Sequence, residues 1–314
     1  MEINAKMVSE LREKTGAGMM KCKEALVQCK GDVEAAVDYL RKKGLASADG
    51  KSGRATSQGL VHPHLSADRR TAVLLEINCE TDFVARNELF KDFIAQLAQH
   101  ALNTPKISTV EELDASTHNG QKVEETRKGL IAKTGENITM GRLERIQIPA
   151  GKYGTFDTYV HGDGNIGVVV QLNTSSQEIA SNPEVITLAH EIALQAAAMK
   201  PRYTDRTEVP AADIQREKEV ILGQIKNDPK NANKPENILA KIVDGRIDKF
   251  YKEYCLVDQT YVKDDSKTIQ DLCNELGKKL GGTITVGTFR RWVLGERPAA
   301  TETPKAEACC ACCG

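Results

Sequence analysis

The chain has 314 residues, of which 43 are lysine or arginine and 44 are aspartate or glutamate, so its formal net charge is −1. Hydrophobic residues at 40% and charged residues at 28% are typical of a globular protein, and the balanced charge provides no overall field to hold a nucleic-acid backbone or an anionic membrane. No apolar run approaches the ~20 residues of a membrane-spanning helix, and the N-terminus lacks the apolar stretch of a signal peptide, so we expect a cytoplasmic protein.

Residues 1–47 predict a compact module of three helices. Their apolar positions recur at helical spacing: Val8 and Leu11 in the first helix, Met19, Cys22, Leu26 and Cys29 in the second, and Val33, Ala36, Val37 and Leu40 in the third. We expect Gly16, Gly31 and Gly44 to end these helices and Asp32 to cap the third. Residues 48–59 are rich in Gly, Ser and Ala, which predicts a linker.

Two adjacent methionines open the second predicted helix. Because Met19 and Met20 follow one another, a helix can bury only one of them on its apolar face. Either both cover a poorly sealed small core, or the one left outside offers an adaptable apolar surface to a partner, since methionine packs well against irregular surfaces. The sequence leaves both interpretations open.

An internal repeat at an offset of 95 residues organises the rest of the chain. Val73-Leu74-Leu75-Glu76-Ile77-Asn78 matches Val168-Val169-Val170-Gln171-Leu172-Asn173, and Ala85 and Asn87 match Ala180 and Asn182. A helix with one apolar stripe follows each strand: Phe90, Phe93, Ile94, Leu97, Ala98 and Ala101 in the first copy, and Val185, Leu188, Ala189, Ile192, Ala193 and Ala196 in the second. We expect Val61-His62 and Val160-His161 to open the two units. The pattern predicts two related α+β subdomains, 60–150 and 151–298.

The remaining segments complete this plan. A helix over 121–133 and a strand over 138–149 should close the first copy, and a helix over 269–280 and a strand over 283–293 should close the second. Between its two helices the second copy carries an insertion, about 210–255, whose two helices are joined by a segment rich in Asn and Pro. Because the insertion is highly charged, we expect a projecting helical hairpin, either a solvated excursion or a partner-binding arm.

The segment after each matched strand differs between the copies. The first reads Cys79-Glu80-Thr81-Asp82-Phe83-Val84-Ala85, where the second reads Thr174-Ser175-Ser176-Gln177-Glu178-Ile179-Ala180. Since the second copy does without an aromatic there, the architecture does not require Phe83 as a core residue. We expect Phe83 to face outward on a rigid loop, where an aromatic can anchor a partner. The alternative is a local cap over Val84 and Phe90.

No constellation for covalent chemistry is present. The six histidines show no H-E-x-x-H spacing, and neither a P-loop nor a G-x-S-x-G motif occurs, so we expect no enzyme, no catalytic residue and no cofactor. Five scattered cysteines are expected to be free thiols in a reducing compartment. The other four, Cys309, Cys310, Cys312 and Cys313, lie in a Pro/Ala/Thr/Glu-rich segment, 299–314, that predicts a flexible tail. Soft-metal or redox chemistry there is the alternative.

Two long motifs in this chain resemble the bacterial-type elongation factor Ts family, the guanine-nucleotide exchange factors of elongation factor Tu. They are Lys14-Thr15-Gly16-Ala17-Gly18-Met19-Met20-Lys21-Cys22-Lys23-Glu24-Ala25-Leu26 and Asn78-Cys79-Glu80-Thr81-Asp82-Phe83-Val84-Ala85. Lys133-Thr134-Gly135-Glu136-Asn137 and His161-Gly162 are also similar to family segments. The resemblance covers nearly the whole chain.

This resemblance implies a fold and a set of contacts. The fold is α+β: a ubiquitin-associated-like N-terminal module, then two related subdomains with a helical hairpin in the second. The implied partner is elongation factor Tu, with Thr81, Asp82, Phe83 and Val84 disturbing its Mg²⁺ and GDP indirectly. Further implied contacts are Met19, Met20, Thr134, Gly135 and His161. A homodimer or a 2:2 complex remains open, and a binding adaptor that uses the ubiquitin-associated-like module is the alternative function.

Overall fold

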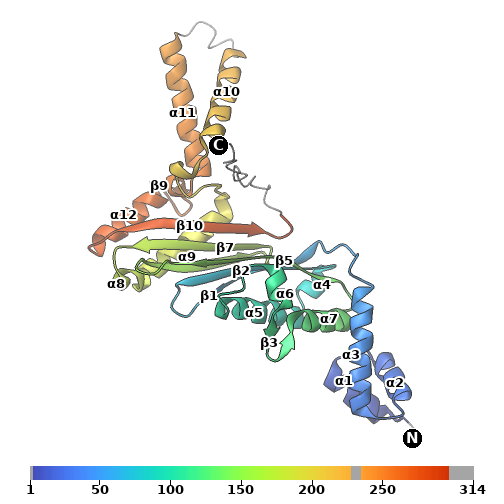
Figure 1. Ribbon diagram of the computed structural model, residues 1–314. Helices are drawn as coiled ribbons and strands as arrows, with labels where there is room; N and C mark the ends of the chain where they lie inside the picture. Colours follow the sequence, from blue (N-terminus) through green and yellow to red (C-terminus); the bar gives the residue numbers. More distant parts are fainter. Residues whose placement is uncertain (1–2, 228–234, 297–314) are drawn as a thin grey trace, which may run out of the picture.

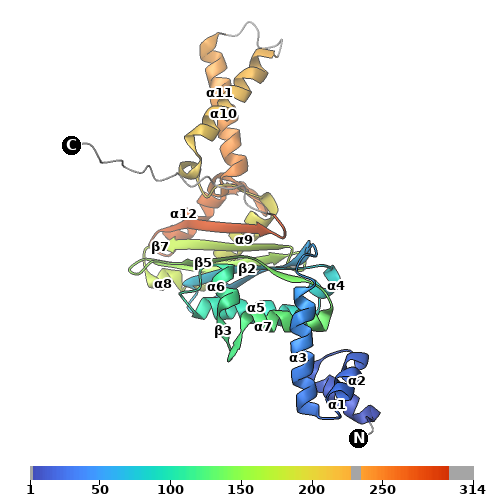
Figure 2. The same cartoon turned by 45° about the vertical axis from the view of Figure 1, so that its right-hand side comes forward.

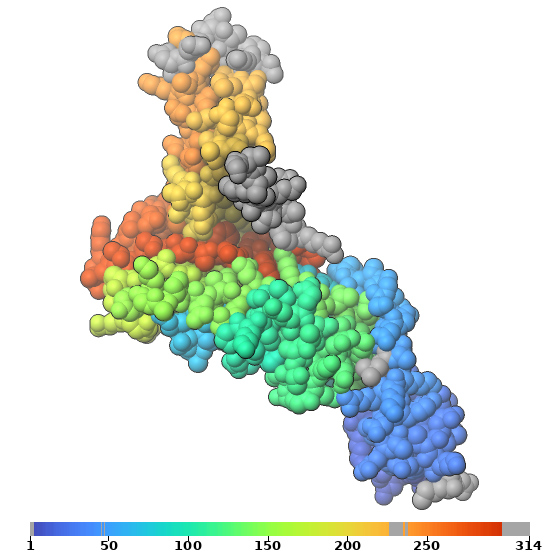
Figure 3. Space-filling view, in the orientation of Figure 1, coloured from blue at the N-terminus to red at the C-terminus, as the bar shows by residue number. Residues whose placement is uncertain are grey.

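The computed structural model describes residues 3–227 and 235–296. It has three parts: a helical module at the N-terminus, a core of two α+β subdomains, and a helical hairpin that projects from the core (Figures 1 and 2). In the space-filling view, the module and the hairpin protrude from different ends of the core (Figure 3). The predicted tail, 299–314, lies outside the described residues.

The N-terminal module consists of α1 (Ala5–Thr15), α2 (Met19–Gln28) and the first part of α3 (Val33–Asp49). Its small core contains Val8, Leu11, Cys22, Leu26 and Ala36. Asn4 and Asp32 cap α1 and α3 through their side chains, and Gly16 ends α1 with a φ of 68°. The three-helix prediction is therefore confirmed.

Helix α3 corrects the prediction that Gly44 ends the third helix. The helix runs through Gly44 to Asp49, and strand β1 begins at Gln58. The predicted linker, 48–59, therefore overlaps α3 at its start and β1 at its end. The physical reason for a mid-helix glycine is a close packing contact, because a Cβ on Gly44 would lie 3.0 Å from the Cβ of Ala132.

The first subdomain contains an antiparallel sheet of order β1-β2-β5, covered on one face by α5. Its strands are β1 (Gln58–Leu65), β2 (Thr71–Cys79) and β5 (Ile138–Gln147), and its main helices are α5 (Glu88–Asn103) and α7 (Val123–Thr134). Shorter elements are α4 (Asp82–Ala85), α6 (Val110–Ala115), β3 (Thr117–His118) and β4 (Gln121–Lys122).

The second subdomain repeats this arrangement with an antiparallel sheet of order β6-β7-β10. Its strands are β6 (Tyr153–His161), β7 (Ile166–Thr174) and β10 (Ile284–Val293), and its helices are α8 (Gln177–Ala180), α9 (Pro183–Met199) and α12 (Ile269–Lys279). The insertion contains α10 (Ala211–Asn227) and α11 (Glu236–Tyr254), flanked by η1 (Arg206–Glu208), η2 (Leu256–Asp258), β8 (Thr260–Tyr261) and β9 (Asp264–Thr268). The α+β fold class and the inserted helical pair agree with the predictions.

The strand register confirms the repeat but corrects one of its matches. Gly59 pairs with Asn78 in the first sheet, and Gly154 pairs with Asn173 in the second, so the offset of 95 holds across both strands. The predicted match of Val61-His62 with Val160-His161 is wrong, because Val160-His161 lies at the far end of β6. Two shared letters in β-rich sequence are too few to fix a register.

The two sheets pack against each other through their inner faces, while α5 and α9 cover the outer faces. Ala72 and Leu74 of β2 meet Phe156 and Val169 of the second sheet in one apolar cluster. On the other side of β2, Val73, Leu75 and Ile77 face α5. This helix–sheet–sheet–helix arrangement follows from the alternation of side chains along a strand.

One buried ion pair lies at the junction of the two sheets. Arg142 Nε is 2.9 Å from an oxygen of Glu76, whose residue is only 4% exposed, and the guanidinium lies over the ring of Trp292. Glu76 also accepts from the backbone amide of Gly295, and Arg142 donates to the carbonyl of Val293. The charges are therefore paired and hydrogen-bonded, as burial demands.

The hairpin is held together by a narrow apolar seam that contains Ile221, Ile225, Val243 and Ile247. Among the described residues, no helix has the length and apolar character needed to cross a membrane.

Candidate functional site

The segment after β2 forms a corner that contains one helical turn rather than only a loop. We call residues 80–85 the Phe83 corner. Thr81 has extended backbone, and its hydroxyl accepts the backbone N–H of Val84, so it caps the short helix α4. Val84 and Ala85 are buried and anchor the turn to the core, whereas Phe83 points away from it with 82% of its surface exposed.

This exposure decides between the two interpretations of Phe83. A local cap over Val84 and Phe90 would have buried the ring, yet Phe90 is fully buried without it. Asp82 is half exposed beside it and lies 3.5 Å from the guanidinium of Arg86 on the next turn. The corner therefore presents a bare aromatic ring and a carboxylate to the outside, which agrees with the outward-facing prediction.

The corner is braced by the residues that follow α7. Glu136 accepts two hydrogen bonds from Thr81, one from its backbone amide at 3.0 Å and one from its hydroxyl at 2.6 Å. The backbone amide of Asn137 donates to Glu80 at 2.6 Å, and the side chain of Asn137 donates to the carbonyls of Ser52 and Arg54. Charge-assisted hydrogen bonds of this kind hold backbone strongly, so Phe83 stands on a stiff support.

A buried thiol lies beneath the same corner. Cys79 donates to the carbonyl of Thr81 at 3.2 Å, and burial, followed by the charge of Glu136, raises the pKa of its thiol to about 12. The thiol therefore stays neutral at physiological pH and acts as a small apolar residue.

The methionine surface, Met19 and Met20, differs from the prediction. Met19 is 48% exposed and Met20 is 76% exposed, so neither belongs to the core of the module and the expectation that Met19 lies on the apolar face of α2 is wrong. The reason is that α2 begins at Met19, so its first turn extends beyond the small core that Cys22 and Leu26 fill. The structure thus favours the exposed apolar surface over the poorly sealed core.

The other predicted contact residues lie at turns. Thr134 and Gly135 end α7, where Gly135 adopts a φ of 81° and Thr134 is half-buried. His161 is exposed at the end of β6, and its Nδ1 lies 3.2 Å from the hydroxyl of Tyr159. The turn after His161 reaches the first subdomain, because the carbonyl of Gly164 accepts the amide of Val61.

A surface hollow of about 540 Å³ joins that turn to the Phe83 corner. Its lining includes Glu80, Thr81, Asp82, Arg86, Asp163 and Asn165. The structure therefore brings the His161 turn and the Phe83 corner, which are far apart in sequence, to the two sides of one hollow. The methionine surface lies on the separate N-terminal module (Figure 1).

Comparison with known proteins decides the family. Residues 80–296 match the model of the family described as Elongation factor TS. The chain is 44% identical to Elongation factor Ts of Nostoc punctiforme over 296 residues, 94% of this chain and 93% of the relative. It is 45% identical to Elongation factor Ts of Symbiobacterium thermophilum and 43% identical to that of Clostridium perfringens strain 13, each with the same coverage. The chain belongs to the elongation factor Ts family.

Membership of the elongation factor Ts family places the chain among the translation elongation factors, in a family of nucleotide exchange factors. Among the residues that the structure describes, no group of three or more histidine, cysteine, aspartate or glutamate side chains is arranged to hold a metal ion. The four clustered cysteines of the tail lie beyond residue 296, outside this description.

Sequence reasoning missed the residues of the elongation factor Ts fold that support the site. Glu80, Glu136 and Asn137 stand in the family-like segments, but local pattern predicts no contact between them, and it predicts no role for Arg86. The partners of Glu80, Glu136 and Asn137 lie 55 or 57 residues away along the chain, and no local pattern predicts such a bond. Arg86 instead pairs with Asp82, four residues before it. The signal that could have found them is the abundance of polar residues at the end of a predicted helix, opposite a predicted corner.

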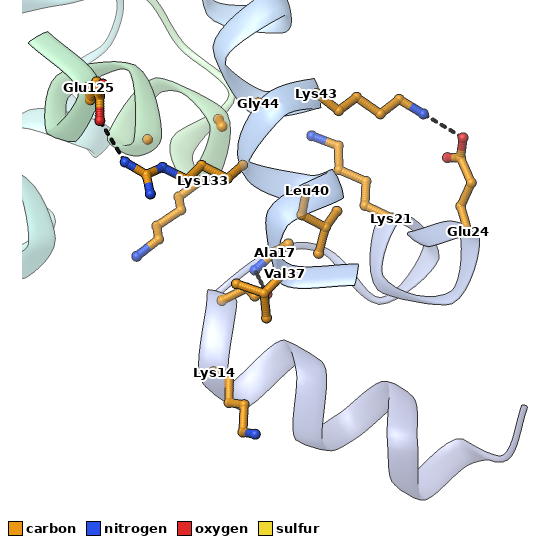
Figure 4. A pocket seen from close by; sticks show the side chains of 14 residues that line it. Lys14, Ala17, Lys21, Glu24, Val37, Leu40, Lys43, Gly44, Glu125 and Lys133 are labelled. Atoms are coloured by element: carbon orange, nitrogen blue, oxygen red, sulfur yellow. Dashed lines mark hydrogen bonds and ion pairs between the residues drawn. The ribbon is translucent and has the colours of Figure 1, made fainter. Parts of the chain in front are cut away.

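A second hollow lies where the N-terminal module meets α7. This cavity of about 290 Å³ has an apolar floor that includes Val37 and Leu40 and a rim that includes Lys14, Lys21 and Lys133 (Figure 4). Arg41, on α3, forms an ion pair with Glu125 of α7 at 2.6 Å, and Lys43 forms one with Glu24 of α2. The hollow therefore marks the joint between the module and the core.

Proposed function

We propose that this chain binds elongation factor Tu carrying GDP and promotes release of the nucleotide, so that GTP can bind. The observation that carries the proposal is Phe83, which is 82% exposed on a corner braced by Glu136 in a member of the elongation factor Ts family. An exposed aromatic on a rigid support is the kind of residue that anchors an interface. No enzyme chemistry and no cofactor of its own is required for this task.

Phe83 acts as an apolar wedge. The ring enters a slot on the nucleotide domain of the partner and displaces a helix there, because a braced corner transmits the energy of burial to its partner rather than yielding itself. Asp82 then perturbs the polar network around the magnesium ion without ligating the metal. Thr81 and Val84 keep the corner in shape, one through its cap and its bonds to Glu136, the other by its burial.

The GDP·Mg²⁺ unit of a GTPase is sensitive to such displacement. Magnesium requires near-ideal octahedral geometry, so a small shift of its surroundings weakens its binding. The phosphates are held by backbone amides at the start of a helix, which also depend on position. A wedge that moves these elements therefore weakens the binding of GDP without any chemical change to the nucleotide.

Exchange then follows from thermodynamic coupling. If the factor weakens GDP binding by a given ratio, GDP weakens factor binding by the same ratio. A ternary complex of factor, partner and GDP therefore loses the nucleotide, and incoming GTP later expels the factor. The factor must favour the nucleotide-free conformation of the partner, since equal affinity for both conformations shifts nothing.

The remaining contacts extend the interface. Met19 and Met20 dock on the nucleotide domain, Thr134 and Gly135 lie beside the corner, and His161 contacts a more distant domain of the partner. Exposure of both methionines supports their role. It also suits a binding adaptor for ubiquitin-like partners, and pull-down of elongation factor Tu or of ubiquitin with the full chain separates the two functions.

The decisive experiment is the release of fluorescent GDP from elongation factor Tu, followed by stopped flow. The wild-type chain should accelerate release, and Phe83→Ala should slow the accelerated reaction about ten-fold or more, since loss of an interface anchor costs ~2 kcal/mol. Glu178→Ala is the matched control, because Glu178 is exposed at the equivalent position of the second subdomain. It should leave release unchanged.

Thermal unfolding of the three proteins should coincide, because neither exposed side chain contributes to the core. A Phe83→Ala chain that folds normally and still releases GDP at the wild-type rate would remove the wedge from the mechanism. A wild-type chain without effect on GDP release would refute the proposed function itself.

A further inference from the structure

The N-terminal module is connected to the core by one continuous helix. The first turns of α3, which include Ala36, pack in the module against Leu11 and Leu26, and the helix then continues to Asp49 beside α7 (Figures 1 and 4). Because a helix is stiff over such a length, the place where α3 lies on α7 sets the position of the whole module.

Several contacts fix α3 and the module on α7. One is the close approach of Gly44 to Ala132, where a Cβ on the glycine would be 3.0 Å from the alanine methyl. Arg41 pairs with Glu125 at 2.6 Å, and Lys128 pairs with Asp49 at 2.9 Å, so along α3 an ion pair lies on each side of that contact. These contacts come from successive turns of α7, which restrains sliding as well as rotation.

The same helix also reaches the module directly. The side chain of Lys133 lies against Gly16 at the end of α1, where a Cβ would be 3.4 Å from its Cε. The ammonium group is thereby placed near the carbonyl end of α1, which a positive charge stabilises. Helix α7 thus contacts both the last helix of the module and the first.

The C-terminal end of α7 also holds the Phe83 corner. The helix ends at Gly135, and Glu136 then accepts both hydrogen bonds from Thr81. One helix of twelve residues therefore carries the module on its side and the Phe83 corner at its C-terminal end.

We propose that α7 is a strut that fixes the spacing between the methionine surface and the Phe83 corner, with Gly44 and Glu136 as its positioning residues. This inference rests on the proposed function, in which both surfaces engage the same partner. Two surfaces held at a fixed, matched spacing bind as one, because engagement of the first presents the second at a high effective concentration. Little ordering entropy is then lost on binding.

The first test measures the spacing without any partner. Spin labels are placed at Met20→Cys and Leu89→Cys, both exposed positions, in the full chain with Cys29, Cys309, Cys310, Cys312 and Cys313 replaced by serine. Double electron–electron resonance then reports the distance distribution. Gly44→Leu should shift or broaden the distribution, because its side chain collides with α7 while leucine favours the helix. An unchanged distribution would overturn the strut.

Gly129→Leu is the matched control. Gly129 lies within α7 itself, yet a Cβ there meets no atom within 4 Å. Gly129 lines the open hollow of about 290 Å³ at the joint, so the substitution adds the same side chain where there is space rather than at a close contact, and the distance distribution should match that of the wild type. If Gly44→Leu proves unstable, Gly44→Ala with and without Ala132→Gly replaces it. Ala132→Gly should restore the wild-type distance distribution, because it removes the methyl group that the new side chain of Gly44→Ala meets. Failure to restore the distribution would count against a positioning role for the contact between the two residues.

The second test asks whether the spacing matters for exchange. Gly44→Leu should reduce the second-order rate constant of GDP release about five-fold, through loss of the second point of attachment. In the Met20→Ala background it should have little further effect, whereas in the Phe83→Ala background it should retain its full effect. Equal effects in all three backgrounds would overturn the proposal. A wild-type chain that fails to accelerate GDP release from elongation factor Tu would instead refute the proposed function. The distance measurement would still decide whether α7 fixes the spacing between the methionine surface and the Phe83 corner.

Discussion

The two corners of the core are built alike from different residues. Thr81 caps α4 and Ser176 caps α8 at the equivalent position, and each short helix is followed by an asparagine, Asn87 or Asn182, that caps the next long helix. Both asparagines accept the backbone amide two residues later, at 2.9 and 2.8 Å. The shared residues of the repeat are thus those that build the turn.

One brace is also common to both corners. In the first, the backbone amide of Asn137 donates to Glu80, and in the second the backbone amide of Thr283 donates to the hydroxyl of Ser175. The strand that closes each subdomain therefore supports the corner in the same way, although the accepting side chains differ in charge and length.

The corners differ in what they present and how firmly they hold it. Phe83 in the first corresponds to Glu178 in the second, and Glu136, which grips the first corner, corresponds to Gly282. A Cβ on Gly282 would lie 2.3 Å from Ser175, so the second corner has no room for such a side chain. The duplicated scaffold thus has one corner that presents an exposed aromatic ring held by Glu136, and one that presents neither.

The equivalent glycines of the two sheets offer the largest expected effect. A Cβ at Gly59 would be 2.1 Å from the carbonyl oxygen of Ile77, and at Gly154 2.3 Å from that of Leu172. Both substitutions to alanine should destabilise the chain, and Gly59→Ala should cost about 3 kcal/mol, near the upper end of ordinary overpacking. Gly59 also has a φ of +146°, which disfavours a side chain. Gly59→Ala should therefore lower the free energy of unfolding more than Gly154→Ala does.

Urea unfolding of both variants checks this order. Gly129→Ala is the control, since a Cβ there meets no atom within 4 Å. Equal stability of Gly59→Ala and the wild type would show that the two strands can separate at this point, and the structural basis of the repeat would then need another explanation.

An exchange of residues between the two corners tests whether the aromatic side chain acts only at the first corner. Phe83→Glu combined with Glu178→Phe preserves composition and net charge, but moves the aromatic to α8, on the other side of the core from α4 (Figure 1). With the double variant, we expect GDP release from elongation factor Tu to be at least about ten-fold slower than with the wild type, because an interface anchor is lost. The single variant Glu178→Phe should retain the wild-type rate.

Retention of exchange by the double variant would mean that the position of the aromatic is immaterial. The second corner, which has no counterpart of Glu136, would then serve as well as the first, and the role assigned to Glu136 would be lost. Circular dichroism of all variants should remain unchanged, because both positions are exposed.

Local pattern was sufficient for most of the fold. The apolar stripes of α5 and α9, the cap of α3 at Asp32, and the strands β2 and β7 follow from periodicity and from residues within a few positions of one another. The exposure of Phe83 was also predictable, because comparison of the two copies separates residues that the scaffold needs from those it does not. Repetition within a chain here takes the place of comparison between chains.

Long-range contacts account for what the sequence could not predict. Gly44 was expected to end a helix, because a glycine in helical sequence usually marks an end, and only the position of Ala132 explains why it does not. The support of Thr81 by Glu136 spans 55 residues along the chain. Such contacts depend on how elements pack, which periodicity alone does not specify.

A smaller effect is expected from acid, at a position where the two copies carry different titratable groups. His62 of β1 corresponds to Asp157 of β6, which pairs with Arg69 at 3.3 Å. The Nε2 atom of His62 is buried without a hydrogen-bond partner, and burial, followed by the charge of His64, lowers the pKa of His62 to about 4. The neutral form is therefore favoured in the folded chain.

The sign of the acid effect follows from proton linkage. Between the ordinary pKa of 6.5 and about 4, the unfolded chain binds a proton at His62 that the folded chain does not, so the free energy of unfolding falls as the pH is lowered through this range. His62→Leu should reduce the loss of stability between pH 7 and pH 5, measured by urea unfolding. An equal loss in both proteins would assign the acid sensitivity to other groups.

The smallest effect is expected from the cysteine-rich end of the chain. The match to the elongation factor Ts family model ends at residue 296, and every contact assigned to the site lies before it. Deletion of residues 305–314 should therefore leave GDP release unchanged, with or without added Zn²⁺ and reductant. A clear loss in the truncated chain, or a Zn²⁺ effect confined to the full-length chain, would show that the clustered thiolates act on exchange. They would then do so as a soft-metal or redox element that neither core subdomain contains.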